Sequence, residues 1–176
     1  ARFARLVVEA VRKAVGPWVP ISFRISADEF IKGGNTLDDT LKLLEYIEPE
    51  VDIINVSAAV NDSIQYQIDK CDLPDAWRAY LSEAVKKKFN KPVIISGNIR
   101  NPQVADQIIA EGKTDFIAIG RGLIADPDWA PQSTERPYLR YPQVYFLQHR
   151  LCRSPHRQIP ADPLHRQSGC LWRRSL

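Results

Sequence analysis

Apolar residues follow two different spacings along the first 130 residues of the chain. Four short segments rich in apolar residues predict strands at residues 21–26, 51–57, 93–96 and 116–119. Before and between these runs, apolar residues recur every three or four positions, and this spacing predicts amphipathic helices. The helical stripes contain Val7, Val8, Val11, Val15, then Leu37, Leu41, Leu44, Ile47, then Leu81, Ala84, Val85, Phe89, and last Val104, Ile108, Ile109.

Turn and cap residues set the bounds of these helices. The first helix is expected to stop at Gly16, which a proline follows. Asn35 or Thr36 can cap the second helix, and Asp75 can cap the third. Asn101 precedes a proline, which suits a cap followed by the first helical position. Strands and helices therefore alternate from residue 1 to about residue 130.

Four strand–helix units of this kind predict an α/β fold with a parallel sheet and right-handed crossovers. Two architectures fit the alternation, namely an open doubly wound sheet and part of an eight-stranded TIM barrel. A complete barrel needs about 250 residues, so about 130 residues would supply half of one. For the barrel reading, we expect four neighbouring parallel strands in sequence order, with helices on one outer face.

Two glycine-containing segments follow the third and fourth predicted strands. Gly97 and Asn98 come after the third strand, and Gly120 and Arg121 come after the fourth. Glycine lets backbone N–H groups approach a ligand closely, and the N-terminus of a following helix favours binding of an anion. The guanidinium group of arginine adds a positive charge with several N–H donors in a fixed geometry. Each glycine alone could simply make a tight turn. Both segments together, on consecutive units, favour a phosphate site.

Arg24 is the third candidate, because it lies inside an apolar strand between Phe23 and Ile25. A buried arginine needs a partner. An ion pair with Asp28, or an open position at the strand end, would explain it without a ligand. The functional interpretation is a cation at the mouth of a barrel that binds an electron-rich ring.

Composition changes the picture mainly at the C-terminal end. Residues 1–130 hold 16 Lys+Arg and 19 Asp+Glu, a net charge of 16 − 19 = −3, whereas residues 131–176 hold 8 Arg and 2 acids, a net charge of 8 − 2 = +6. We expect two regions, a half barrel over 1–130 and an irregular, disordered tail over 131–176. A basic tail of this kind could contact nucleic acid, which is one alternative function.

Several classes of protein are not favoured. The sequence contains no run of about 18 apolar residues, so no membrane span is predicted. The N-terminus has no signal-peptide pattern. The cysteines Cys71, Cys152 and Cys170 have no disulfide or metal spacing, so we assign no metal site. These features favour a cytoplasmic protein without a membrane or nucleic-acid partner.

Several motifs together resemble the NADH:flavin oxidoreductase family, which includes the Old Yellow Enzymes. The segments that carry the resemblance are Phe23–Ser26 with Asp28–Phe30 and Gly33-Gly34, then Pro92–Pro102 with its Ser96-Gly97-Asn98, and Asp115–Pro127 with its Gly120-Arg121-Gly122-Leu123. They are similar to the fifth, seventh and eighth strands of that barrel. The resemblance extends over residues 1 to about 130, and it is stronger toward the iron–sulfur flavoenzymes similar to 2,4-dienoyl-CoA reductase and enoate reductase.

The resemblance implies FMN as cofactor and NAD(P)H as reductant. Arg24 would contact the pyrimidine side of the flavin, while Gly97, Asn98, Gly120 and Arg121 would hold its phosphate. Hydride would pass through FMN to the β-carbon of an activated alkene or enoyl substrate. The family's substrate-polarising and proton-donating residues belong to the first four strands, which have no counterpart here, so no catalytic residue is assigned and the fragment alone is expected to be inactive. Another phosphate-binding TIM-barrel enzyme, or a non-catalytic fragment with a basic interaction tail, remains the alternative.

The tail itself yields a testable prediction, that residues from about 131 onward are a frameshifted reading. Combining the last two bases of each codon with the first base of the next permits cysteine at the junctions after Val144, Leu147, Leu151 and Leu164. That C-x2-C-x3-C-x12-C pattern resembles the family's [4Fe–4S] segment, since such clusters are held by four cysteine thiolates. The chain as written would not retain the cluster. Gene sequencing tests this, and the idea is wrong if no one-base shift near codons 130–132 restores the four cysteines.

Overall fold

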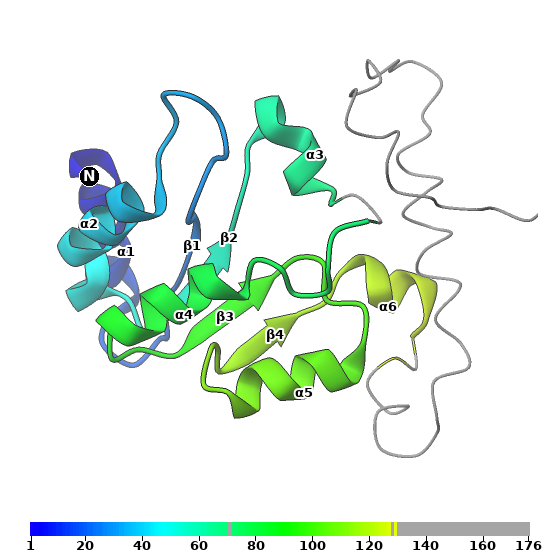
Figure 1. Ribbon diagram of the computed structural model, residues 1–176. Coiled ribbons are helices and arrows are strands. Elements are labelled where there is room, and N and C mark those ends of the chain that lie inside the picture. Colours follow the sequence, from blue (N-terminus) through cyan, green and yellow to red (C-terminus); the bar gives the residue numbers. More distant parts are fainter. Residues whose placement is uncertain (70–71, 128, 130–176) are drawn as a thin grey trace, which may run out of the picture.

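The computed structural model describes residues 1–69, 72–127 and 129. Within them, four strands form one parallel sheet in the order β1-β2-β3-β4, namely β1 (Ser22–Ser26), β2 (Ile53–Ser57), β3 (Val93–Ser96) and β4 (Phe116–Ala118) (Figure 1). Arg24 pairs with Asn55 across the first ladder, and Ser96 pairs with Ala118 across the last. The predicted strands and their parallel, sequential order are confirmed. The described strands show no reversal of order, which a doubly wound sheet requires.

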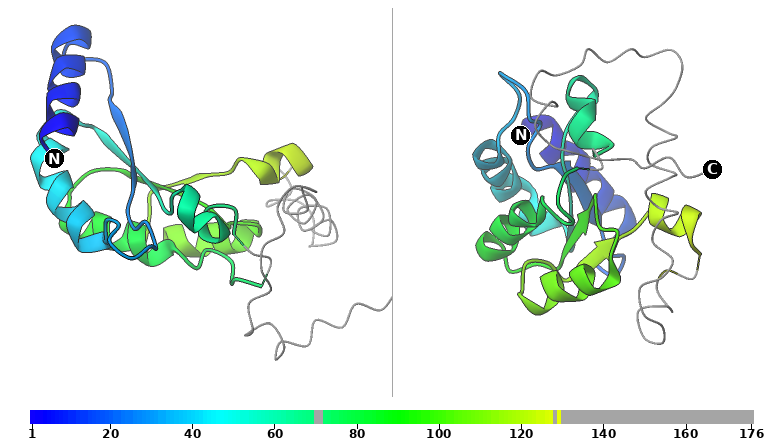
Figure 2. Two further views of the ribbon diagram at one scale, coloured as in Figure 1. Left: turned by 90° about the horizontal axis from the view of Figure 1, so that it is seen from above. Right: turned by 45° about the vertical axis from the view of Figure 1, so that its right-hand side comes forward.

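Four helices cover the outer side of this curved sheet. They are α1 (Arg2–Val15), α2 (Leu37–Ile47), α4 (Ala79–Lys88) and α5 (Pro102–Ala110). Figure 2 shows them along the convex side of the sheet, with the short helices α3 (Ile64–Gln67) and α6 (Arg121–Ala125) set apart from this layer. Two 3-10 turns, Glu48–Glu50 and Asn61–Ser63, complete the elements of the described chain. The helices lie on one face, as the sequence predicts for an α/β barrel fragment.

The core lies between the sheet and these helices. On β2, Ile54 and Val56 are buried against the helical layer, while Asn55 and Ser57 alternate onto the other face and are only partly buried. The strand β3 repeats this pattern, because Val93 and Ile95 are buried and their neighbours are not. The inner face of the sheet therefore carries partly buried side chains, which are polar at Asn55, Ser57 and Ser96 and apolar at Ile53 and Ile94.

Most of the predicted helix caps and helix ends are found in the structure. Gly16 ends α1 with a positive φ of 77°. Thr36 caps α2 in a capping box with Asp39, and Asn101 caps α5 by accepting from the Gln103 N–H. The prediction for Asp75 is wrong, since α4 begins only at Ala79, after Arg78.

Asp75 has a different and longer-range partner. Its carboxylate accepts from the backbone N–H groups of Arg100 and Asn101, both at 3.1 Å, and from the Arg100 Nε at 2.8 Å. The side chain therefore joins the segment before α4 to the segment before α5. These contacts fix the loop that follows β3, which carries two of the predicted site residues.

Ion pairs fasten the opposite edge of the sheet, where the strands begin. Arg12 reaches from α1 to Asp52, with 2.5 Å between its Nη2 and the carboxylate, and Asp52 also accepts from the Ile21 N–H. The Ile21 N–H and the Arg12 guanidinium lower the pKa of Asp52. Lys86 pairs with Asp115 in the same way, at the starts of β3 and β4.

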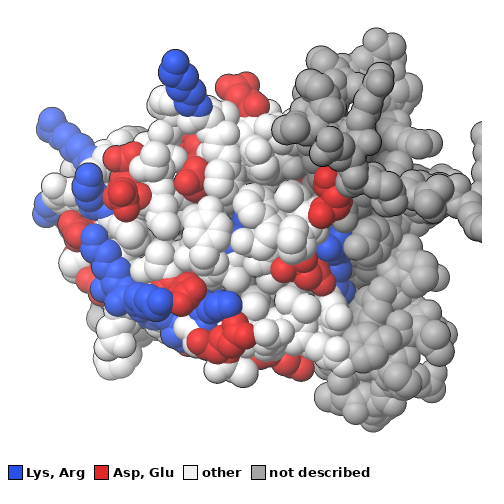
Figure 3. Space-filling model, viewed as in Figure 1, with Lys and Arg blue, Asp and Glu red and all other residues white. Residues whose placement is uncertain are grey.

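Charged residues of both signs mix over the helical side of the molecule (Figure 3). Lys88 pairs with Glu45, and Lys87 pairs with Glu83, so the lysine run at the end of α4 is a solvated face. Within the part of the chain that the structure describes, no helix has the length and apolar character needed to cross a membrane.

Candidate functional site

A cavity of about 390 Å³ opens where the strands end, at the C-terminal edge of the sheet. It brings together all five residues that the sequence singles out, namely Arg24, Gly97, Asn98, Gly120 and Arg121. Ser57, Ser96 and Arg78 also line it. The carboxyl ends of parallel strands meet at this edge, which is why residues far apart in sequence converge there.

Gly97 follows β3 with a φ of +115°, a backbone conformation that side chains rarely adopt. A Cβ at this position would lie 1.6 Å from Nη2 and 2.4 Å from Cζ of Arg78. The sequence predicts this glycine for the approach of a ligand, but in the structure the guanidinium of Arg78 fills the space. Glycine is therefore required at this position by the protein itself.

Asn98 continues the turn with a φ of +49°. Its side-chain amide donates to the backbone oxygens of Pro74, at 2.7 Å, and Leu73, at 3.3 Å. The amide group therefore fastens the neighbouring loop. The side-chain N–H groups of Asn98 are therefore engaged within the protein, which leaves its backbone N–H as the donor that an anion in the cavity could meet.

Gly120 and Arg121 form the opposite side of the cavity. A Cβ on Gly120 would meet no atom within 4 Å, so nothing in the described structure demands glycine there. Arg121 donates from Nη1 to the backbone oxygen of Ile68, at 2.7 Å. The helix α6 that starts at Arg121 has five residues, so the helix dipole expected from the sequence contributes little and the guanidinium carries the positive charge.

Arg24 extends from the inner face of β1, opposite the core. Its guanidinium donates from Nη2 to Ser57 Oγ at 3.2 Å, and the side chain is exposed. Asp28, considered as its ion-pair partner, accepts instead from the Phe30 N–H. The ion pair with Asp28 is therefore not formed, and Arg24 is an exposed cation in the middle of β1 that lines the cavity.

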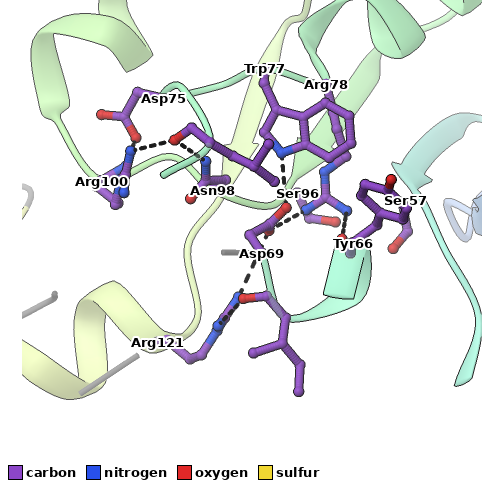
Figure 4. A network of polar contacts seen from close by, with 12 residues as sticks. Ser57, Tyr66, Asp69, Asp75, Trp77, Arg78, Ser96, Asn98, Arg100 and Arg121 are labelled. Atoms are coloured by element: carbon purple, nitrogen blue, oxygen red, sulfur yellow. Dashed lines mark hydrogen bonds and ion pairs between the residues drawn. The ribbon is translucent and has the colours of Figure 1, made fainter. Parts of the chain in front are cut away.

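A buried network that was not predicted from the sequence lies beside the cavity (Figure 4). Arg78 is 4 % exposed and donates from Nη2 to Asp69 Oδ2, at 2.7 Å, and from Nη1 to the Tyr66 oxygen, at 3.0 Å. The other carboxylate oxygen of Asp69 accepts from Trp77 Nε1 at 2.9 Å. Arg78 Nε is buried and has no hydrogen-bond partner among the described residues.

One sequence signal could have drawn attention to Arg78. It stands in what the sequence predicts as the first turn of a helix, where the helix dipole disfavours a cation. Asp69 offers no such signal, because its partners come from other segments of the fold.

Charge is unbalanced at this cavity. Three guanidinium groups line it, from Arg24, Arg78 and Arg121, and no carboxylate among the described residues does. Asp69 lies behind them with a side chain that is 0 % exposed, so the local net charge is 3 − 1 = +2. Burial raises the pKa of Asp69 and lowers that of Arg78, while their mutual attraction opposes both shifts. The site is therefore built to receive an anion.

Comparisons with known proteins agree with this geometry. The family model of the NADH:flavin oxidoreductase / NADH oxidase family matches residues 1–138. The chain is 44% identical over 135 residues to an NADH oxidase of Thermoanaerobacter brockii, covering 76% of this chain and 21% of that protein. It is 30% identical over 142 residues to a cinnamate reductase of Clostridium sporogenes, covering 72% and 21%.

A solved structure of 2-naphthoyl-CoA reductase in complex with 2-naphthoyl-CoA shares the fold, with a TM-score of 0.68 and 24% identity over 76% of this chain and 21% of that one. The chain thus spans about a fifth of the length of these relatives. The match of the family model to more than two thirds of the chain, on the segments that form the sheet and the cavity, shows that the chain belongs to the NADH:flavin oxidoreductase / NADH oxidase family.

Proposed function

We propose that this chain is the FMN-binding, C-terminal half of a TIM-barrel oxidoreductase, with β1 to β4 as strands five to eight. The longer protein, called here the full-length enzyme, would pass hydride from NAD(P)H through FMN to an activated alkene. The observation that carries the proposal is the cavity with a local charge of +2 at the C-terminal edge of a parallel sheet. Active sites of TIM barrels lie at that edge.

The residues present fit the phosphate of FMN. A phosphate monoester carries a charge of about −1.5 to −2 at neutral pH, which the excess of guanidinium groups would neutralise. Arg78 Nε, buried and without a partner in the described structure, is an available donor. Gly120 places bare backbone on the cavity wall, since a Cβ there would meet nothing within 4 Å. Both the charge and the open backbone favour a phosphate over a neutral ligand.

The protein's contribution would be binding and orientation. Arg121 and the backbone at Gly97, Asn98 and Gly120 would hold the phosphate, while Arg24 would face the pyrimidine side of the flavin and stabilise negative charge there. Bound FMN would supply the hydride chemistry itself. Residues that polarise the substrate would come from the other half of the barrel, so no catalytic residue is proposed in this chain.

The substrate class rests on the relatives. A cinnamate reductase and a 2-naphthoyl-CoA reductase are named for conjugated substrates, which supports an alkene or enoyl substrate for the full-length enzyme. Membership of the iron–sulfur branch, with a [4Fe–4S] cluster in the full-length enzyme, stays part of this proposal. The predicted cluster segment and the predicted irregular tail lie outside the described residues.

Of the alternatives, another phosphate-binding barrel enzyme loses support from the family assignment. Nucleic-acid binding by a basic tail also concerns residues outside the described ones. Flavin absorbance of the purified full-length enzyme separates the proposal from both, since a colourless protein that binds no FMN would contradict it.

Arg121→Ala is expected to weaken FMN binding about 10- to 100-fold, because it removes one hydrogen-bonding charge from the phosphate site. The melting temperature of the apo-enzyme should change little, since Arg121 is only partly buried. Arg5→Ala, which removes an exposed arginine from α1, is the matched control. Flavin content after dialysis provides the measurement, and equal occupancy in Arg121→Ala and the control would refute the assignment.

A further inference from the structure

The segment from Tyr66 to Asp69 supplies acceptors to two of the three cavity arginines. Tyr66 O and Asp69 Oδ2 accept from Arg78, and Ile68 O accepts from Arg121. Arg121 Nη2 lies 4.0 Å from Asp69 Oδ2, so both guanidinium groups approach the same carboxylate oxygen. The segment 66–69 thus binds arginine side chains from two places, Arg78 after β2 and Arg121 after β4.

Asp69 is the centre of this arrangement. Its side chain is 0 % exposed, and its φ of +53° is unusual for a residue other than glycine. The indole N–H of Trp77 holds its second oxygen, and the Trp77 ring packs against Phe30 and Tyr66, with ring centroids 5.5 and 5.9 Å away. The carboxylate is therefore fixed from both sides before any ligand binds.

We propose that Asp69 is a positioning residue for the anion site, holding the Arg78 and Arg121 guanidinium groups so that both present donors to one phosphate. This inference rests on the proposed function, because it takes the FMN phosphate as the anion. The carboxylate acts through the arginines and does not line the cavity. Without it, two neighbouring guanidinium groups would repel each other and separate.

Simple electrostatics gives the opposite expectation, which makes the proposal testable. Removing a negative charge behind a phosphate site should tighten phosphate binding if geometry does not matter. If Asp69 positions the arginines, its removal should instead weaken binding of the phosphate. Comparing FMN with riboflavin isolates the effect, since riboflavin has the same ring system and no phosphate.

The test uses the apo form of the full-length enzyme and the variant Asp69→Asn. Asparagine keeps one acceptor oxygen for Trp77 and tolerates positive φ, but it replaces the oxygen that accepts from Arg78 with an NH2 donor, so the variant removes both the charge and the hydrogen bond that holds Arg78. We expect FMN binding to weaken about tenfold or more while riboflavin binding stays within about twofold, as fluorescence titration with each flavin would measure. Asp62→Asn, at an exposed carboxylate in the same β2–α4 connection, is the matched control and should change neither affinity.

A second variant keeps the test decisive if Asp69→Asn fails to fold. Trp77→Phe removes the donor to Asp69 and part of the indole but keeps an aromatic ring in the packing, so it should cause a smaller loss that is again specific to FMN. FMN binding that is unchanged or tighter in the folded variants would overturn the role of Asp69. If the unmodified enzyme itself does not prefer FMN to riboflavin, the phosphate assignment fails, and with it the proposed function.

Discussion

Replacing Gly97 by alanine is expected to lower the FMN affinity of the full-length enzyme by about 100-fold or more, and to destabilise the fold. The added Cβ would lie 1.6 Å from Arg78 Nη2, so the guanidinium must leave Asp69. Separating a buried ion pair costs about 3–5 kcal/mol. The φ of +115° adds about 1–3 kcal/mol for any residue with a side chain.

Gly112→Ala is the matched control for the backbone term alone. Gly112 also has a positive φ, of 71°, but a Cβ there would meet nothing within 4 Å. Flavin content after dialysis and thermal unfolding would be compared for both variants. If Gly97→Ala loses no more flavin than Gly112→Ala, the contact between Arg78 and Gly97 does not support the site.

The second large effect concerns the chain on its own. Expressed by itself, without the proposed other half of a barrel, it is expected to self-associate or to precipitate at micromolar concentration. Within the described residues, β1 and β4 have unpaired edges, and such edges promote association. The helix α1 and the residues after it add large apolar side chains, with Phe3 80 %, Leu6 55 % and Trp18 93 % exposed.

Sedimentation over a range of concentrations measures this association. The triple variant Phe3→Ser, Leu6→Lys and Trp18→Ser should weaken it by more than about tenfold, because burying each such side chain contributes about 1.5–3 kcal/mol. Tyr46→Ser, at an exposed position on α2, is the control and should have little effect. A monomer that unfolds in one cooperative transition would contradict the prediction.

Local patterns in the sequence predict the architecture well, because the strands are short segments rich in apolar residues and each helix has its own apolar stripe. The caps at Thr36 and Asn101 are predicted correctly for the same reason, since their partners lie within three residues. Asp75 looks like the same kind of cap, but its carboxylate binds backbone N–H groups 25 and 26 residues away. Tertiary contacts determine the hydrogen-bond partners of Asp75, and no local sequence pattern predicts those contacts.

Some residues of the candidate site could likewise be predicted from local sequence patterns, and others could not. Gly97 and Arg121 follow from their places after strand ends, and Arg24 follows from its charge inside a predicted strand; the parallel sheet brings all three to one cavity. The pairing of Arg78 with Asp69 could not be predicted, because it depends on the tertiary fold and not on a local pattern. The reason for glycine at position 97 changes accordingly, from open space for a ligand to the space that Arg78 occupies.

The ion pairs where the strands begin have a consequence for how this protein can change. Arg12–Asp52 and Lys86–Asp115 lie at one edge of the sheet, and the cavity lies at the other. A five-residue strand such as β2 separates the two edges by about 16 Å, beyond the distance at which substitutions usually couple. The effects of substitutions at the two edges on the free energy of unfolding should therefore be additive. A substitution that stabilises the edge with the ion pairs can offset the stability lost when the cavity is altered to bind a new ligand.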